Sequence, residues 1–512
     1  MTQVQSESVV ADIDALRQVV VERLRAGDRF AGLFATASEA NPGRPGGAGD
    51  VEVTLNVAIA STAGVQLTST QVVDAYPCLT ADVPAAFWYE RVLHDLFGVT
   101  PVGHPRLDPL VLPLPAGREA DTDSRRLPRP GSPIHLARLV PDERAVPRHV
   151  HGKGLFTIPH GPVRSGVMES VEYLVETPGE DIPHLQVRIF AKHRGVERAF
   201  QGRTVDDGVL LAEHAEGTSS VAHALAYSHA VEACAGVEAP RAATLVRVLH
   251  AELERIANHL DAAVKLADAA GLAVAVARFG IHKERVMRLR DGLCGNRFGR
   301  GVVEPGGVTS LPEPVVDSSE QLARLRGDIR SDAHALMSTS SFLDRIRTTG
   351  PLPPPTARTH GALGPVARGS GFHDDCRVMR PYDGYSELSM LPAPEEEAGD
   401  AQARTRVRWH EIDESFHLIE QVLPRLPQRA EPTELRVPVG EPSGQGIGWA
   451  EAAQGEVLYV VDLARGRITR CWPRSASLHN LSLFHEVFVG DILTDFPFIE
   501  ASFGLSIAGA VL

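Results

Sequence analysis

Two side chains with proton chemistry, His223 and Tyr227, stand four residues apart in a segment whose apolar residues recur at helical spacing. Residues four apart on a helix share a face, so both could line one pocket, where a phenol donates a proton and an imidazole relays it. The alternative is a buried pair whose polar atoms are satisfied by the backbone. The pair is therefore a candidate catalytic site with a structural alternative.

A short polar cluster precedes this pair, formed by Glu213, His214 and Glu216. Carboxylates beside an imidazole can bind a hard metal ion or relay a proton. The other interpretation is a solvated loop. Glu216 is the stronger candidate for proton transfer, because burial disfavours the charged form of a carboxyl group.

Metal and nucleotide chemistry of other kinds has little support. The five cysteines stand far apart with no C-x-x-C pair, at positions 78, 234, 294, 376 and 471, which argues against a disulfide framework, a zinc ribbon and a cluster held by this chain alone. The glycines at 444, 446 and 448 precede a strand-like run at 456–461 rather than a helix, so they fail the context of a dinucleotide loop and predict a turn. The sequence contains no Walker motif, so we expect no binding of NADH or ATP.

Bulk properties exclude further classes. With 51 basic and 65 acidic residues in 512, the formal charge is −14, and only 5% of residues are aromatic, so nucleic acid is not an expected partner. The polar, acidic start at residues 1–7 does not fit a secretory leader. No apolar run approaches the ~20 residues that span a bilayer, so we expect a cytoplasmic protein that reaches a membrane only through partners.

The predicted helices and strands around these residues indicate an α+β fold. A helical pattern at 9–25, strand-like runs at 51–60 and 65–73 and a helical stretch at 85–96 predict a small α+β domain over residues 1–112. Prolines and charges predict a linker over 113–150. Residues 151–512 then form a large domain with a central bundle of long helices and flanking β-structure; the helical patterns lie at 218–235, 240–268, 279–294, 318–348 and 407–423.

Several motifs resemble a known family. Residues 87–91 (FWYER), 94–99 (HDLFGV) and 103–105 (GHP) resemble the small peripheral-arm subunit of complex I. The following chain resembles the family shared by the quinone-site subunit of complex I and the large subunits of group 4 hydrogenases, including hydrogenase-4 and formate hydrogenlyase. The residues that carry this second resemblance are 193–197 (HRGVE), 222–232, 240–241, 252–260, 306–308, Asp375 with Arg377, 381–385 and 455–456.

The departures from this family decide which chemistry is expected. Nickel–iron members hold their metals with two cysteine pairs, and the resemblance places those four positions on Glu216, Ser219, Ser506 and Gly509. Carboxylate, hydroxyl and glycine do not replace soft thiolate ligands. We therefore expect no nickel–iron centre, as in the energy-converting hydrogenase-related complexes that keep the scaffold and lose the metal.

The complex I relatives bind a quinone headgroup between a tyrosine and a histidine. The resemblance places the tyrosine on Tyr227 and the histidine on Met168, so one quinone ligand is missing, although His160 or Arg164 could substitute. Asp375 and Arg377 match a motif that approaches the same cavity, but such a pair is usually a structural ion pair. Quinone is the candidate cofactor, bound near these residues.

The resemblance implies a subunit of a respiratory-type oxidoreductase on the cytoplasmic face of the inner membrane. Its expected partners are an iron–sulfur small subunit, whose cluster supplies electrons, and antiporter-like and quinone-channel membrane subunits. The main alternative is a catalytically silent scaffold that bridges the redox and membrane subunits. A true hydrogenase with replaced ligands is a third interpretation, which nickel in the purified protein would support.

Overall fold

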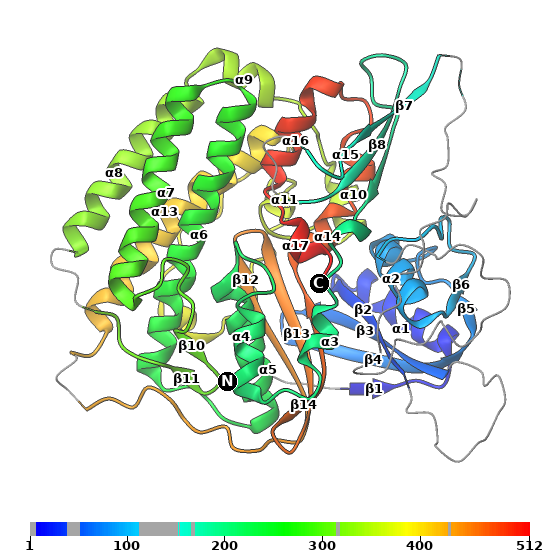
Figure 1. The fold of residues 1–512 in the computed structure, drawn as a ribbon, viewed down its shortest axis with the longest axis horizontal. Coiled ribbons are helices and arrows are strands. Elements are labelled where there is room, and N and C mark those ends of the chain that lie inside the picture. The colour runs from blue at the N-terminus through cyan, green and yellow to red at the C-terminus, as the bar shows by residue number, and fades with distance from the viewer. Residues whose placement is uncertain are drawn as a thin grey trace.

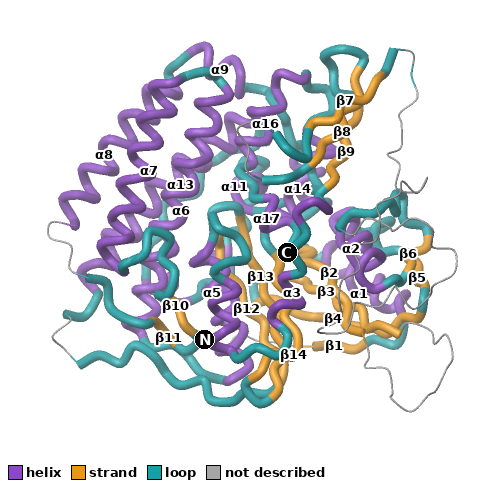
Figure 2. The backbone as a smooth tube through the Cα atoms, viewed as in Figure 1, coloured by secondary structure: helices purple, strands orange, loops and turns teal. Residues whose placement is uncertain are grey.

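The computed structural model describes residues 7–37, 52–111, 152, 154–164, 169–313, 318–428 and 432–512. The predicted linker at 113–150 lies outside these residues, so the predicted division into domains stays a prediction. The α+β class is confirmed: helices and strands mix along the chain, and Figure 2 shows the strands gathered into sheets beside a bundle made of helices.

The N-terminal unit, residues 7–111 in its described parts, is built on a six-stranded sheet. The strand order is β2-β3-β4-β5-β6, and β1 pairs in parallel with β4. Helix α1 begins where the Asp12 side chain accepts a hydrogen bond from the Ala15 amide, and it buries Leu16 and Val20 against the sheet. The elements are β1 Glu7–Val9, α1 Ile13–Arg25, β2 Arg29–Ala37, β3 Glu52–Ser61, β4 Gly64–Val73, β5 Ala75–Pro77, η1 Pro84–Ala86, α2 Phe87–Phe97 and β6 Thr100–Val102.

The rest of the chain forms the large unit, which contains two small three-stranded sheets and several short helices around helix α5 (Ser220–Ala235). One sheet contains β7 to β9 and the other contains β12 to β14, both antiparallel. Their elements and the short helices nearby are β7 Phe156–His160, β8 Glu172–Thr177, β9 His184–Arg188, η3 Phe190–Lys192, α3 Val196–Phe200, α4 Val205–Ala212, β12 Gly444–Ala452, β13 Gly455–Ala464, β14 Arg467–Arg474, α14 Ala476–Leu481, α15 Phe484–Val487, η6 Leu493–Asp495, α16 Phe496–Phe503 and α17 Ile507–Ala510.

The predicted central bundle of long helices is present. In Figure 1, α6, α7, α8 and α13 run side by side, with α5 between this bundle and the sheet of β12 to β14. The helical pattern at 318–348 is split by Ser338 and Thr339 into α8 and α9. The remaining elements are α5 Ser220–Ala235, α6 Arg241–Ala269, α7 Ala273–Cys294, β10 Val303–Glu304, β11 Gly307–Val308, α8 Ser318–Met337, α9 Ser340–Ile346, α10 Pro354–Thr359, α11 Gly364–Arg368, α12 Cys376–Met379, η4 Asp383–Glu387, α13 Ala401–Val422 and η5 Leu423–Arg425.

The turn predicted at Gly444, Gly446 and Gly448 is wrong, because these residues lie in β12. A Cβ at Gly446 would stand 1.9 Å from the Ala230 carbonyl oxygen, and one at Gly448 would stand 2.2 Å from the Ala226 oxygen. The glycines therefore let the strand approach the backbone of α5. None of the described helices is both long and apolar enough to span a bilayer.

Candidate functional site

Helix α5 carries the predicted histidine and tyrosine and is buried over its first thirteen residues. Its N-terminal amides are satisfied from the neighbouring helix, because the Glu254 carboxylate of α6 accepts hydrogen bonds from the amides of Val221 (2.9 Å) and Ala222 (3.0 Å). The opposite side of α5 packs on β12 and β13. This packing fixes His223 and Tyr227 in the interior.

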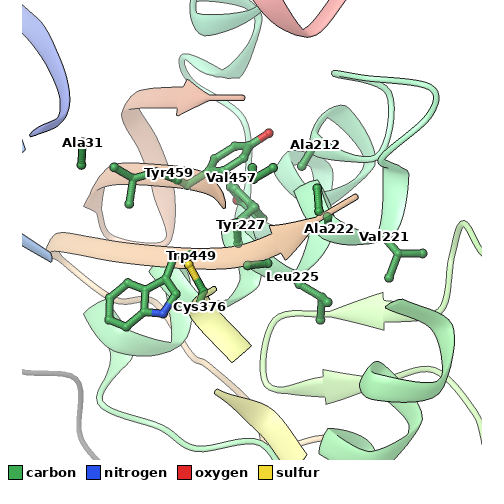
Figure 3. Close-up of a cluster of buried hydrophobic side chains, with 14 of the residues drawn as sticks. Ala31, Ala212, Val221, Ala222, Leu225, Tyr227, Cys376, Trp449, Val457 and Tyr459 are labelled. Carbon is green, nitrogen blue, oxygen red and sulfur yellow. The ribbon is translucent and has the colours of Figure 1, made fainter. Parts of the chain in front are cut away.

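Tyr227 is fully buried, and its hydroxyl donates to the Val205 carbonyl oxygen at 2.9 Å. Gly208 leaves room for this hydroxyl, since a Cβ there would stand 2.1 Å from it. The ring stacks on Phe200 and meets Tyr459 edge-on, and Figure 3 shows Tyr227 and Tyr459 within the same buried cluster. Burial raises the pKa of Tyr227 well above its usual value. The Tyr227 hydroxyl is thus satisfied by the backbone.

His223 points instead into a polar cluster with Glu216. The Tyr459 hydroxyl lies 2.9 Å from His223 Nδ1, and Nε2 lies 3.3 Å from Glu216 Oε2. A neutral imidazole that donates from Nε2 to the carboxylate and accepts at Nδ1 from the phenol satisfies all three groups. The Ser475 hydroxyl donates to the same carboxylate oxygen at 2.6 Å, and Thr218 donates to Oε1 at 3.1 Å. The cluster forms a continuous hydrogen-bonded chain from Tyr459 to Ser475.

Glu216 occupies the space that a side chain at position 509 would need. A Cβ on Gly509 would stand 2.1 Å from Glu216 Oε2. Ser219 donates to Gln454 (2.9 Å), and Ser506 donates to Glu169 (2.8 Å). Each residue at the four positions that the resemblance assigns to metal ligands therefore has a local role.

These four residues do not fit a nickel–iron centre, because they present no thiolate and the Glu216 carboxylate fills the space beside Gly509. Across the described ranges, no three His, Cys, Asp or Glu side chains are grouped so that they could hold a metal ion. The polar cluster at 213–216 does not act as a unit either. Glu213 accepts from the Gly301 amide at 2.7 Å, whereas His214 Nδ1 contacts the Leu210 oxygen at 2.6 Å. Burial raises the pKa of Glu213 to about 7.

The candidate quinone contacts on β7 and the loop after it form a separate group. Arg164 pairs with Glu500 at 2.9 Å, and its guanidinium lies 5.0 Å from the centre of the Tyr173 ring. The His160 ring stacks on Tyr173, and burial lowers the pKa of His160. Met168 lies outside the described residues. Because Arg164 is already paired, a ligand would have to compete with Glu500 for it.

Asp375 and Arg377 lie in a buried ionic network rather than beside Glu216. Arg377 pairs with Asp375 (2.7 Å), with Glu414 (2.6 Å) and with Glu252 (3.2 Å). The facing guanidinium groups hold the pKa of Asp375 far below its usual range, against the cost of burial. The structure gives the two residues the contacts of structural ion pairs.

Sequence reasoning missed Tyr459 and Ser475, the partners of the predicted histidine and glutamate. Tyr459 lies on β13 and Ser475 follows β14, more than 200 positions from α5 in the chain. No spacing rule connects residues so distant in sequence. The predicted strand at 456–461 reads Glu-Val-Leu-Tyr-Val-Val, a nearly continuous apolar run typical of a strand buried on both faces, and this run was the only sequence signal that Tyr459 lies in a core.

A cavity of about 50 Å³ adjoins this cluster, where the two units meet. Its polar lining comes from His193, Glu197 and Ser475, and its apolar lining comes from α2, β2, β14 and residues 509–512. Burial raises the pKa of Glu197 to about 7, an effect that the charge of Arg470 only partly offsets. The motif at 193–197 thus forms one wall of the cavity.

Comparison with known proteins matches both units to respiratory proteins. Residues 271–439 match the family described as the 49-kDa subunit of respiratory-chain NADH dehydrogenase, and residues 9–118 match its 30-kDa subunit. The chain is 30% identical over 370 residues to the membrane-bound hydrogenase subunit alpha of Pyrococcus furiosus, covering 67% of this chain and 84% of that protein.

Other similar proteins align with most of this chain. Formate hydrogenlyase subunit 5 of Escherichia coli is 27% identical over 437 residues, covering 83% of this chain and 75% of that protein. The C/D 2 protein of the NADH-quinone oxidoreductase of Aquifex aeolicus is 27% identical over 469 residues, covering 80% of each chain. A chain in the structure of an archaeal membrane-bound sulfane sulfur reductase shares the fold, with a TM-score of 0.65 and 23% identity over 71% of this chain and 100% of that one.

Proposed function

This chain belongs to the family of the 49-kDa subunit of complex I and the membrane-bound hydrogenase large subunits, with a 30-kDa-type unit fused at its N-terminus, and we propose that it serves in electron transfer without hydrogen chemistry. In this proposal it is a subunit of a membrane-associated oxidoreductase complex. Electrons pass from an iron–sulfur partner to a quinone or another acceptor, and the transfer is coupled to ion translocation.

The observation that carries the proposal is the polar cluster of Glu216, His223 and Tyr459, which includes one of the positions that the resemblance assigns to metal ligands in the hydrogenase relatives. A carboxyl, an imidazole and a phenol in hydrogen-bond contact can hold and move protons, which an acceptor needs when it takes up electrons. The acceptor would bind beside this cluster, near Arg164, His160 and Met168. Because Tyr227 is hydrogen-bonded to Val205, its proposed role requires that this bond open when the acceptor binds.

The proposed partners are an iron–sulfur small subunit and antiporter-like and quinone-channel membrane subunits. The chain would attach through them to the cytoplasmic face of the inner membrane. Affinity purification of the chain from its native membranes in mild detergent, followed by mass spectrometry, tests this assembly. Recovery of a cluster-bearing subunit with antiporter-like subunits is expected, and recovery of the chain alone would contradict the proposal.

Acceptor reduction by the purified complex tests the chemistry. Glu216→Gln and Tyr227→Phe should each abolish reduction while the complex keeps all of its subunits, because each substitution removes one proton-carrying group. Tyr76→Phe on β5 is the matched control, because it removes a buried hydroxyl in the N-terminal unit and should leave turnover unchanged. Wild-type turnover in both variants would count against the proposed site.

The catalytically silent scaffold is the second candidate, and one observation favours it. Glu216 accepts three hydrogen bonds from its own chain and Tyr227 is satisfied by the backbone, so the group is polar but filled. A scaffold predicts that the complex assembles yet reduces no acceptor. Glu216→Gln would then lower stability and change nothing else.

A further inference from the structure

The cavity between the two units is large enough for a few water molecules. Its volume of about 50 Å³ compares with roughly 10–15 Å³ for one water on the same kind of measure. A quinone ring would not fit. The apolar walls include Val92 and Leu96 of α2 and Val511 near the C-terminal end, and Figure 1 places that end beside the N-terminal unit.

The polar atoms on the cavity wall favour water as its occupant. The His193 ring makes a hydrogen bond with the Leu512 backbone, and its buried Nδ1 atom meets no partner of suitable distance and angle within the described ranges. A buried polar atom of this kind is normally satisfied by ordered water. The Glu197 carboxyl lines the same space, with the Arg470 guanidinium and the Cys471 thiol as the charged or titratable groups near it on β14.

Ser475 connects the cavity to the buried cluster. It lines the cavity, and its hydroxyl lies 2.6 Å from Glu216 Oε2. Gly509 forms the adjoining wall and adds no side chain between the cavity and the Glu216 carboxyl. His223 and Tyr459 continue the hydrogen-bonded chain beyond Glu216. The Tyr227 hydroxyl turns away to the Val205 oxygen, so it is not part of this chain.

We propose that this cavity is the route by which protons reach Glu216, from Glu197 through ordered water and the Ser475 hydroxyl. Each carrier takes one proton on one side and releases one on the other, so no electron moves and no bond other than O–H or N–H changes. His223 and Tyr459 hold the Glu216 carboxyl in place and continue the proton-carrying chain beyond it. This inference rests on the proposed function, because an acceptor that gains electrons must also gain protons and therefore needs a proton route.

The test measures proton exchange directly, without turnover. In the full chain labelled with ¹⁵N-histidine, the exchange of the His223 ring N–H with water is followed by NMR, and the signal is assigned by its loss in His223→Asn. Glu197→Gln and Ser475→Ala should slow this exchange on the order of tenfold or more, while Glu197→Asp and Ser475→Thr restore it. The ring of His259, hydrogen-bonded to Glu411 and Arg408, is the internal reference.

Ser475→Ala could disturb folding, because the Ser475 side chain also caps α14. A variant that leaves Ser475 in place is therefore needed as well. Val92→Phe fills the cavity from α2 without touching the hydrogen bonds, and it should slow His223 exchange as well. Unchanged exchange in Glu197→Gln and Val92→Phe would overturn the route, whatever the turnover. Slowed exchange in a complex that reduces no acceptor would support the route and contradict the proposed function, so the two failures are distinguishable.

Discussion

Glu216 and Gly509 fit together only as a pair. The carboxylate lies where any side chain at 509 would begin, and it is held there by Ser475, His223 and Thr218. A glutamate side chain is long enough for its carboxylate to reach Ser475, and there it needs the empty space at position 509. The glutamate at position 216 therefore requires the glycine at position 509.

Gly509→Ala should displace the Glu216 carboxylate and destabilise the protein by about 1–3 kcal/mol, the usual cost of overpacking a filled core. Urea unfolding measures the loss. Gly280→Ala in α7 is the control, because nothing lies within 4 Å of a Cβ there and alanine is favoured over glycine in a helix by about 1 kcal/mol. Equal stability of Gly509→Ala and wild type would show that Glu216 can move at little cost.

Glu197 should make stability fall as the pH rises. Burial raises the pKa of Glu197 in the folded protein to about 7, above its value in the unfolded chain. Between the unfolded-state pKa and the folded-state pKa of Glu197, the folded protein therefore binds more protons than the unfolded chain. The free energy of unfolding declines as the pH increases through this range. Glu197→Gln removes this pH dependence. The free energy of unfolding of the variant minus that of the wild type should therefore be about 1–3 kcal/mol more favourable to the variant at pH 8 than at pH 5. Urea unfolding at both pH values tests this, and a pH-independent difference would contradict it.

At the scale of elements, the approach of β12 to α5 sets the position of the site. Gly446 and Gly448 face the backbone of α5 near Ala226 and Ala230, and this contact holds α5 against the sheet that carries Tyr459 on β13. The His223–Tyr459 hydrogen bond depends on that spacing. The small residues of α5 and β12 thus fix the position of the polar cluster through the packing of the strand on the helix.

Gly448→Ala should force the strand away from the helix, because its Cβ would stand 2.2 Å from the Ala226 oxygen, a backbone atom that cannot rotate aside. We expect a loss of about 3 kcal/mol or more, at the upper end of overpacking costs, and a shifted His223 ring signal in NMR. Gly327→Ala in α8 is the control, since a Cβ there meets nothing within 4 Å. A neutral Gly448→Ala would mean that the packing of α5 on β12 is loose.

The sequence predicted the elements better than their contacts. Long amphipathic helices such as α6 were recognisable because apolar residues repeat over about four turns, and the stripe from Leu245 to Leu260 is buried as expected. Strand β12 was mistaken for a turn because glycine is a turn signal in sequence, whereas here its lack of a side chain serves helix–strand packing. His223 and Glu216, both predicted from the sequence, are hydrogen-bonded in the structure, whereas Tyr227 turns away to the Val205 oxygen. The partners Tyr459 and Ser475 depend on long-range packing that one sequence does not encode locally.

At the scale of the whole molecule, buried charges connect the two units. Arg29 of β2 in the N-terminal unit pairs with Asp374 and, at 2.8 Å, with Glu456 of β13. Glu456 also pairs with Arg380 and with Arg474, whose side chain donates to the Ala31 oxygen of β2 at 3.0 Å. The cavity lies beside this junction, so the separation of the units would change the proposed proton route.

Glu456→Ala should therefore destabilise the chain by about 3–5 kcal/mol, because it leaves the guanidinium groups of Arg29, Arg380 and Arg474 buried without their shared carboxylate. These cations hold the pKa of Glu456 well below its usual value. The stabilisation by Glu456 is thus fully present at a pH above the pKa of this carboxyl in the unfolded chain. It is lost as the pH falls through the pKa in the folded protein. The difference between variant and wild type in urea unfolding should narrow in acid.

The matched control is Glu387→Ala, which removes a carboxylate from the exposed pair with Arg241. Water screens this pair, so the loss should stay below about 1 kcal/mol. Limited proteolysis adds a readout of the junction: cleavage between residues 112 and 151 should leave the two fragments of the wild type associated, because Arg29, Glu456 and Arg474 still join them. In Glu456→Ala the same cleavage should release the N-terminal fragment. Co-elution of both fragments in the variant would show that apolar packing, such as Phe34 stacked on Trp472, is sufficient to hold the units together.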